Sequence, residues 1–113
     1  MNLRQELANL NGKTLATLDR QKRFDVLAVG PKQIFLFLHS SQKERKIRWE
    51  EIEPAWALLQ RQGQLTRVAI NANFSPRNPA YVAALLATLP GVSHRLVTHP
   101  PDKRQVITLY YGR

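Results

Sequence analysis

The hydrophobic positions of this chain follow two different periods, and the change falls near residue 50. Before residue 50, apolar side chains alternate with polar ones or form short runs, which is typical of strands; after it they recur at helical spacing. One exception stands at the N-terminus, where Leu3, Leu7 and Leu10 form a single helical stripe. Asn11-Gly12 follows and indicates the end of that short helix.

Four segments in the first half have the pattern of strands. The segment QIFLFLH, residues 33–39, is apolar on both faces and predicts a central, buried strand. Phe35 and Phe37 share one face of it, where core packing is favoured over stacking against unpaired bases. The connections are short, so an antiparallel meander is the simplest topology. The predicted strands cover residues 13–18, 23–29, 33–39 and 43–49.

The second half predicts three helices followed by a hairpin. Pro54 suits a first helical turn, Thr66 is a fair N-cap, and Asn78-Pro79 makes a good helix start. Glycine and proline residues supply the stops between these segments. The helices are expected at residues 54–62, 66–71 and 79–89, and the strands of the hairpin at residues 93–98 and 105–111.

These elements define an α+β fold. We expect an N-terminal four-stranded antiparallel meander, then a three-helix unit that ends in a C-terminal β-hairpin. A chain of 113 residues has the size of one ordinary domain. We therefore interpret residues 1–113 as a single domain, in which residues 1–49 and 50–113 could form two subdomains with a shared interface.

The order of elements over residues 50–111 resembles a winged-helix domain. The segment LLQRQGQLTRVAI, residues 58–70, resembles the turn between the first two helices of that family, and the hairpin at 93–111 resembles its wing. The resemblance implies that the third helix, residues 78–89, would read DNA. Its sequence opposes this role, because NPAYVAALLATLP contains no charged residue and base readout needs polar side chains on the exposed face.

A helix that is apolar all round is usually buried on two sides. One side of the third helix carries a core stripe of Val82, Leu85, Leu86 and Leu89. The other side is a smooth face that we expect to pack either against the β half of the same chain or against a second chain in a homodimer or other assembly. That candidate interface consists of Ala80, Ala83, Ala84 and Ala87.

Charge is the strongest signal in the composition. Seventeen Lys and Arg residues face eight Asp and Glu residues, which gives a formal net charge of +9 and an isoelectric point near 10.7. A field of that sign attracts polyanions such as nucleic acid. No apolar run approaches the roughly 18 residues of a membrane helix, and the N-terminus has no signal-peptide core. We therefore expect a cytoplasmic protein with no membrane partner.

The meander would bring basic residues from separate segments together. Its first and third turns lie at the same end of the sheet, so the cations around them would form one rim. Lys and Arg on an edge strand also guard against unwanted strand pairing, and that explanation stays open. The predicted rim consists of Arg20, Lys22, Arg23, Lys43, Arg45 and Lys46, with further phosphate contacts from Arg77 before the third helix and from Lys103 and Arg104 at the wing tip.

Catalytic and metal-binding motifs are weak. The chain has no cysteine, and its three histidines lack metal-ligand spacing, so we expect neither a metal nor a cofactor. One pattern, Asp25 followed by Glu44-Arg45-Lys46, superficially resembles the acidic pair and lysine of PD-(D/E)xK nucleases. The proline expected near the first acid is missing, and so are the longer sheet and flanking helices of that family.

Three functional hypotheses follow. The first is a non-enzymatic module that binds DNA or RNA mainly through the phosphate backbone. The second is a protein-interaction or homodimerisation module that uses the apolar helix at residues 79–89. The third and most remote is a metal-dependent nuclease.

Overall fold

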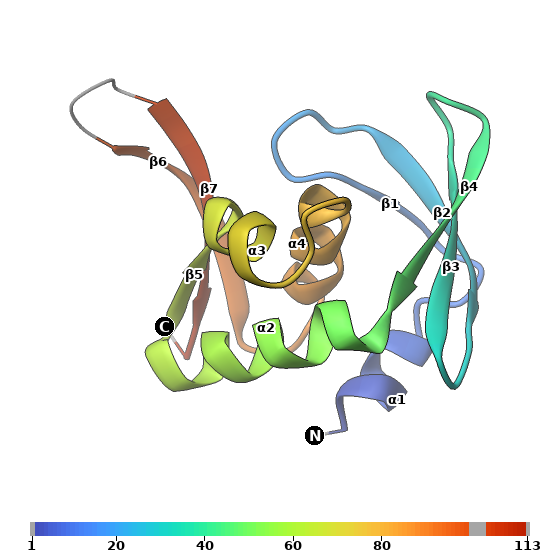
Figure 1. The fold of residues 1–113 in the computed structure, drawn as a ribbon, viewed down its shortest axis with the longest axis horizontal. Helices are drawn as coiled ribbons and strands as arrows, with labels where there is room; N and C mark the ends of the chain where they lie inside the picture. Colours follow the sequence, from blue (N-terminus) through green and yellow to red (C-terminus); the bar gives the residue numbers. More distant parts are fainter. Residues whose placement is uncertain (1, 100–103, 113) are drawn as a thin grey trace.

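The structure is a computed structural model that describes residues 2–99 and 104–112, with the side chains of residues 99 and 104 excepted. It has the predicted α+β architecture, in which a four-stranded sheet and a three-stranded sheet lie on either side of the helices (Figure 1). In chain order the elements are α1 (Leu3–Ala8), β1 (Thr14–Ala16), β2 (Arg23–Val29), β3 (Gln33–Leu38), β4 (Lys43–Arg48), α2 (Trp49–Gln62), β5 (Gln64–Thr66), α3 (Arg67–Asn73), α4 (Pro79–Ala87), β6 (Val92–His99) and β7 (Arg104–Tyr111).

The predicted meander is confirmed. Strands β1 to β4 form an antiparallel sheet in sequence order. Ile34, Leu36 and Leu38 of β3 are buried on the face that meets the helices. One irregularity interrupts β2 between Val26 and Ala28, next to the exposed Leu27.

The prediction that both faces of β3 are buried is wrong. Phe35 and Phe37 are only partly buried, and they alternate with the fully buried positions of the strand. The other side of the sheet therefore stays open, and the two rings do not belong to the core. We call this side the outer sheet face; the register places on it Asp25, Phe35, Phe37, Glu44, Lys46 and Arg48.

Helix α2 begins earlier than the pattern predicts. It starts at Trp49 rather than near residue 54, so Pro54 lies inside the helix instead of in its first turn. Proline at this position lacks the N–H that would bond to the carbonyl of Glu50. The early start is stabilised because Trp49 and Ile52 are buried and because Glu51 accepts a hydrogen bond from the Arg48 N–H at 2.9 Å.

Strand β5 was not predicted. Its three residues lie directly after Gly63, whose φ of 79° ends α2, and they pair with β7 to give the sheet order β5-β7-β6. A segment this short carries no readable alternation, so only its pairing partner defines it as a strand. The Thr66 cap is confirmed: its hydroxyl accepts a hydrogen bond from the Ala69 N–H at 3.0 Å.

Helix α4 is packed inside the molecule. Ala83 and Ala84 are 1% and 3% exposed, and Tyr81 meets Phe24 of β2 edge to face with ring centroids 5.2 Å apart. The alanine face therefore packs within the chain, and Ala83 and Ala84 are not available to a second chain. Ala80 and Ala87 at its ends are partly exposed. Most of the buried hydrophobic residues of both halves belong to one continuous cluster.

No helix within residues 2–99 and 104–112 is long and apolar enough to cross a membrane.

Candidate nucleic-acid interface

The meander brings its first and third turns to the same end of the sheet. Phe24 pairs with Leu38, Leu38 pairs with Lys43, and the His39 N–H donates to the Arg23 carbonyl at 3.1 Å. The turn after β1 and the turn after β3 are therefore neighbours, as predicted. The predicted rim residues at this end are all exposed: Arg20, Lys22, Arg23 and Lys43.

Arg45 and Lys46 do not share a surface. Arg45 lies on the same side of β4 as the buried Ile47, and Lys46 lies on the outer sheet face. The Arg45 guanidinium donates to Asn78 Oδ1 at 3.0 Å and to the Arg77 carbonyl at 3.3 Å. Phosphate binding by Arg45 and Lys46 stays a prediction, and Arg45 has a structural contact as well, because it ties β4 to the start of α4.

A partly buried carboxylate holds the loop before α4. Glu51 Oε1 accepts from Ser75 Oγ at 2.6 Å and from Asn78 Nδ2 at 3.0 Å. Ser75 is fully buried and Asn78 is 4% exposed. Asn78 stands at the predicted cap position, but its side chain bridges Glu51 and Arg45 instead of capping α4. Segments 26 residues apart in the sequence, at Glu51 and Arg77, are thereby fixed beside each other.

The pKa of Glu51 is lowered by this environment. Partial burial acts to raise it, and the hydrogen bonds from Ser75, from the Arg48 N–H and from Asn78, together with the Arg48 charge, outweigh that effect. Glu51 is therefore held as an anion, which is the form that accepts all three hydrogen bonds.

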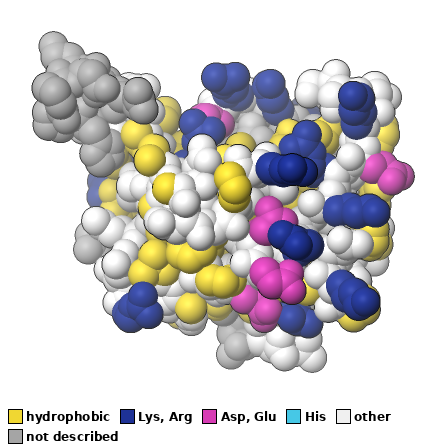
Figure 2. Space-filling view, viewed as in Figure 1, with side chains coloured by type: hydrophobic (Ala, Val, Ile, Leu, Met, Phe, Trp, Pro, Cys, Tyr) yellow, Lys and Arg dark blue, Asp and Glu magenta, His cyan; other side chains and the backbone are white. Residues whose placement is uncertain are grey.

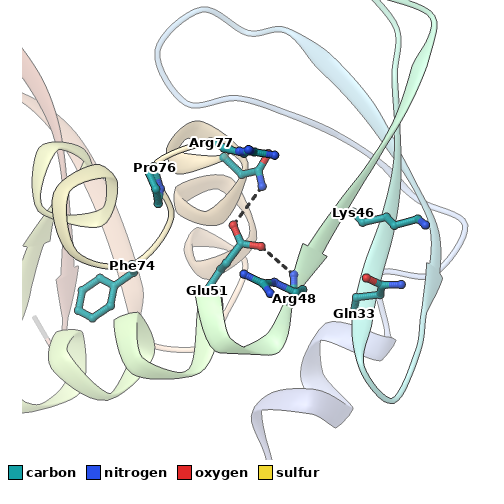
Figure 3. A pocket seen from close by; sticks show the side chains of 8 residues that line it. Gln33, Lys46, Arg48, Glu51, Phe74, Pro76 and Arg77 are labelled. Atoms are coloured by element: carbon teal, nitrogen blue, oxygen red, sulfur yellow. Dashed lines mark hydrogen bonds between the residues drawn. The ribbon is translucent and has the colours of Figure 1, made fainter.

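A groove separates β4 from the loop that Glu51 holds. It consists of two adjoining cavities of about 510 and 580 Å³. Figure 3 shows Lys46 and Gln33 on the sheet side of the first cavity, and Pro76 and Arg77 on the helical side. We call this the basic groove, defined by four cationic residues: Arg45, Lys46, Arg48 and Arg77.

Arg48 was missing from the predicted interface. The available signal was its alternation with Lys46 along β4, which places both side chains on the outer sheet face. Arg48 was not included because it lies at the end of the predicted strand, next to the start of a helix.

A second basic cavity lies at the turn after β1. It measures about 230 Å³ and is lined in part by Arg20, Lys22 and Arg67. Arg67, which was not predicted, lies 3.6 Å from Asp19. Tyr81 lines this cavity, and the centre of its ring lies 6.0 Å from the guanidinium of Arg45, a residue of the basic groove.

The Lys and Arg side chains that are visible in Figure 2 gather over one part of the molecule. Figure 2 shows most of the Lys and Arg side chains over the four-stranded sheet and its junction with the helices. The predicted wing-tip contacts were Lys103 and Arg104. Lys103 and the side chain of Arg104 lie outside the described part of the structure.

The acidic pair of the nuclease hypothesis is not assembled. Asp25 and Glu44 are both paired with Phe37, one on either side, so strand β3 lies between them. Asp25 accepts from Thr14 Oγ1 at 2.6 Å and pairs with His39 Nε2 at 2.9 Å, and these contacts lower its pKa. Within the described residues, no three His, Asp or Glu side chains are grouped to hold a metal ion.

Comparison with known proteins gives no relatives: no family model, no curated protein and no solved structure matches this chain.

Proposed function

We propose that this protein is a non-enzymatic nucleic-acid-binding module that grips the phosphate backbone through the basic groove. The observation that carries the proposal is the convergence of cations from separate segments on one junction. Lys46 and Arg48 come from β4, and Arg77 comes from the loop before α4. With a net charge of +9, such a surface is suited to replace the counterions of a polyanion.

The groove is held in shape by Glu51 and by one of its own cations, Arg45. Glu51 fixes the loop through Ser75 and Asn78, and Arg45 ties that loop to β4. Lys46 and Arg77 remain exposed at the groove. A fixed spacing between exposed cations lowers the ordering cost of binding, and this supports a role in binding rather than in solubility alone.

The order of elements also supports a resemblance to a winged-helix module: α2, α3 and α4 are followed by the β6–β7 hairpin. In such a module the third helix would read the major groove, but α4 is buried along residues 82–86. Binding would therefore rest on phosphate contacts, which give affinity without reading sequence.

A salt series tests the proposal. The double variant Lys46→Glu, Arg77→Glu removes two exposed groove cations. Fluorescence anisotropy would compare labelled duplex DNA, single-stranded DNA and RNA of one sequence. For wild type, log affinity should fall linearly with log salt. In the double variant, affinity should drop and the slope should flatten by about 0.9 per lost phosphate contact on duplex, or about 0.7 on a single strand.

The matched control reverses two exposed cations elsewhere. Lys13→Glu, Arg61→Glu changes the net charge by the same amount and leaves the groove intact. Equal losses in the two double variants would show that only net charge matters. Absence of wild-type binding to every probe at low salt would overturn the proposal.

A further inference from the structure

We propose that the outer sheet face is a stacking platform for unpaired bases, so that the ligand is a single-stranded nucleic acid. This inference rests on the proposed function and specifies its ligand. Phe35 and Phe37 are adjacent same-face positions on β3, and both are partly exposed. Successive bases of a single strand can stack on such rings, because every base has a π-face.

The rings belong to an open surface, not to a second core. In Figure 1 the helices lie on one side of the four-stranded sheet, the side on which Ile34, Leu36 and Leu38 are buried. The rings stand on the other side. Their neighbours across the strands are partly buried or exposed positions, among them Ala28 beside Phe35 and Lys46 on its other flank.

The platform is continuous with the basic groove. The Lys46 Nζ lies 5.9 Å from the centre of the Phe35 ring, and the same side chain lines both cavities of the groove. Arg48 is the next outer-face residue along β4. A strand whose bases lie over Phe35 would thus have its phosphates within reach of Lys46 and Arg48.

Two carboxylates flank the second ring of the platform, between the basic groove and the exposed rim cations Arg23 and Lys43. Phe37 is flanked across the sheet by Asp25 and Glu44. These carboxylates repel phosphate, and they can accept hydrogen bonds from the amino groups of bases. The ligand would therefore keep its backbone along β4 and the groove, and at Phe37 it would turn bases rather than phosphates toward the sheet.

Duplex is a poorer fit for these surfaces. Bases in a duplex are already paired and stacked, so they cannot lie on Phe35 and Phe37 without being unpaired. The alternative reader, α4, is buried along residues 82–86 and carries no charged side chain. A single strand can use both the cations and the rings, and we expect it to bind more tightly than duplex of the same sequence.

The test replaces each ring while keeping an apolar side chain. The variants are Phe35→Leu and Phe37→Leu, with Phe35→Tyr as the variant that keeps a ring. Tyr111→Leu is the matched control, because it removes a partly buried ring from the other sheet. The probes are a labelled single strand of roughly 16 nucleotides, an abasic strand of the same length, and the duplex.

The platform predicts that each Leu variant weakens binding to the single strand by about tenfold. The salt slope should stay unchanged, and so should binding to the abasic strand, which has phosphates without bases. Phe35→Tyr and Tyr111→Leu should keep wild-type affinity. Circular dichroism would check that each variant is folded.

The outcomes separate the two proposals. If the Leu variants keep their single-strand affinity while Lys46→Glu, Arg77→Glu loses it, the platform is wrong and the phosphate-binding function stands. Equal wild-type affinity for the normal and abasic strands would also overturn the platform. If wild type binds no probe at low salt, both proposals fail.

Discussion

At the residue scale, Glu51 has the largest structural role among the described acidic residues. It caps α2 by accepting from the Arg48 N–H, and it satisfies the buried hydroxyl of Ser75 and the buried amide of Asn78. These contacts define where the loop with Arg77 stands relative to β4. The basic groove therefore depends on an anion that does not itself attract the ligand.

Replacing Glu51 with glutamine tests this role. Glu51→Gln puts an amide where a carboxylate accepted three hydrogen bonds, so its NH2 group faces either the Arg48 N–H or the Ser75 and Asn78 donors, and at least one hydrogen bond is lost. We expect a loss of about 1–3 kcal/mol in the free energy of unfolding at neutral pH, measured by urea denaturation. Glu53→Gln on the same helix weakens an exposed pair with Arg4 and should change the free energy of unfolding little.

The lowered pKa of Glu51 predicts that the effect of Glu51→Gln on stability depends on pH. The folded-state pKa of Glu51 lies below its ordinary value of 4.5, so the ionised form stabilises the fold. That stabilisation is complete above the unfolded-state pKa and is lost as the pH falls through the folded-state pKa. The stability difference between wild type and Glu51→Gln should therefore shrink in acid. A difference that stays constant from neutral pH to acid would contradict this role.

At the element scale, β4 and α4 define the candidate site in different ways. Strand β4 is an edge of its sheet. The Trp49 N–H donates to the Lys32 carbonyl. In an antiparallel pair, hydrogen-bonded and non-hydrogen-bonded residue pairs alternate along the strands. The backbone N–H and C=O groups of Glu44, Lys46 and Arg48 therefore point away from β3. Their charges also protect that edge, so edge protection and ligand binding are compatible roles for the same residues.

The packing of α4 within the chain predicts how substitutions of its alanines change stability. Ala84 is buried within the chain, so Ala84→Leu should overpack the core and lower the free energy of unfolding by about 1–3 kcal/mol. Ala72→Leu, at an exposed position of α3, should have little effect. Denaturation of both variants checks this. A wild-type homodimer that Ala84→Leu converts to a fully stable monomer, seen by light scattering, would contradict the packing within one chain.

At the scale of the whole molecule, the two halves share one buried cluster. It runs from Leu7 and Phe24 in the first half to Leu86 and Leu109 in the second. Because the basic groove lies between the halves, its shape depends on that shared core. The surface that would bind the ligand and the interior that joins the sheets are therefore coupled.

A shared core predicts cooperative unfolding. Far-ultraviolet circular dichroism follows both sheets and all the helices, whereas tryptophan fluorescence follows Trp49 and Trp56 in α2. We expect the two signals to give the same urea midpoint, as in a two-state transition. Two separated midpoints would show that the halves fold as independent units, and the groove would then not be a fixed site.

The sequence by itself determined the meander, the Thr66 cap and the type of every element except β5, because periodicity and glycine, proline and threonine signals act locally. It also determined the charge and the neighbouring turns of the sheet. Only the tertiary structure decided the remaining features. Burial is a property of what packs on a residue, so the open face of Phe35 and Phe37 and the enclosed Ala83 and Ala84 depended on where the helices lie. Likewise, Asn78 became a bridge instead of a cap because Arg45 and Glu51, distant in sequence, were brought beside it.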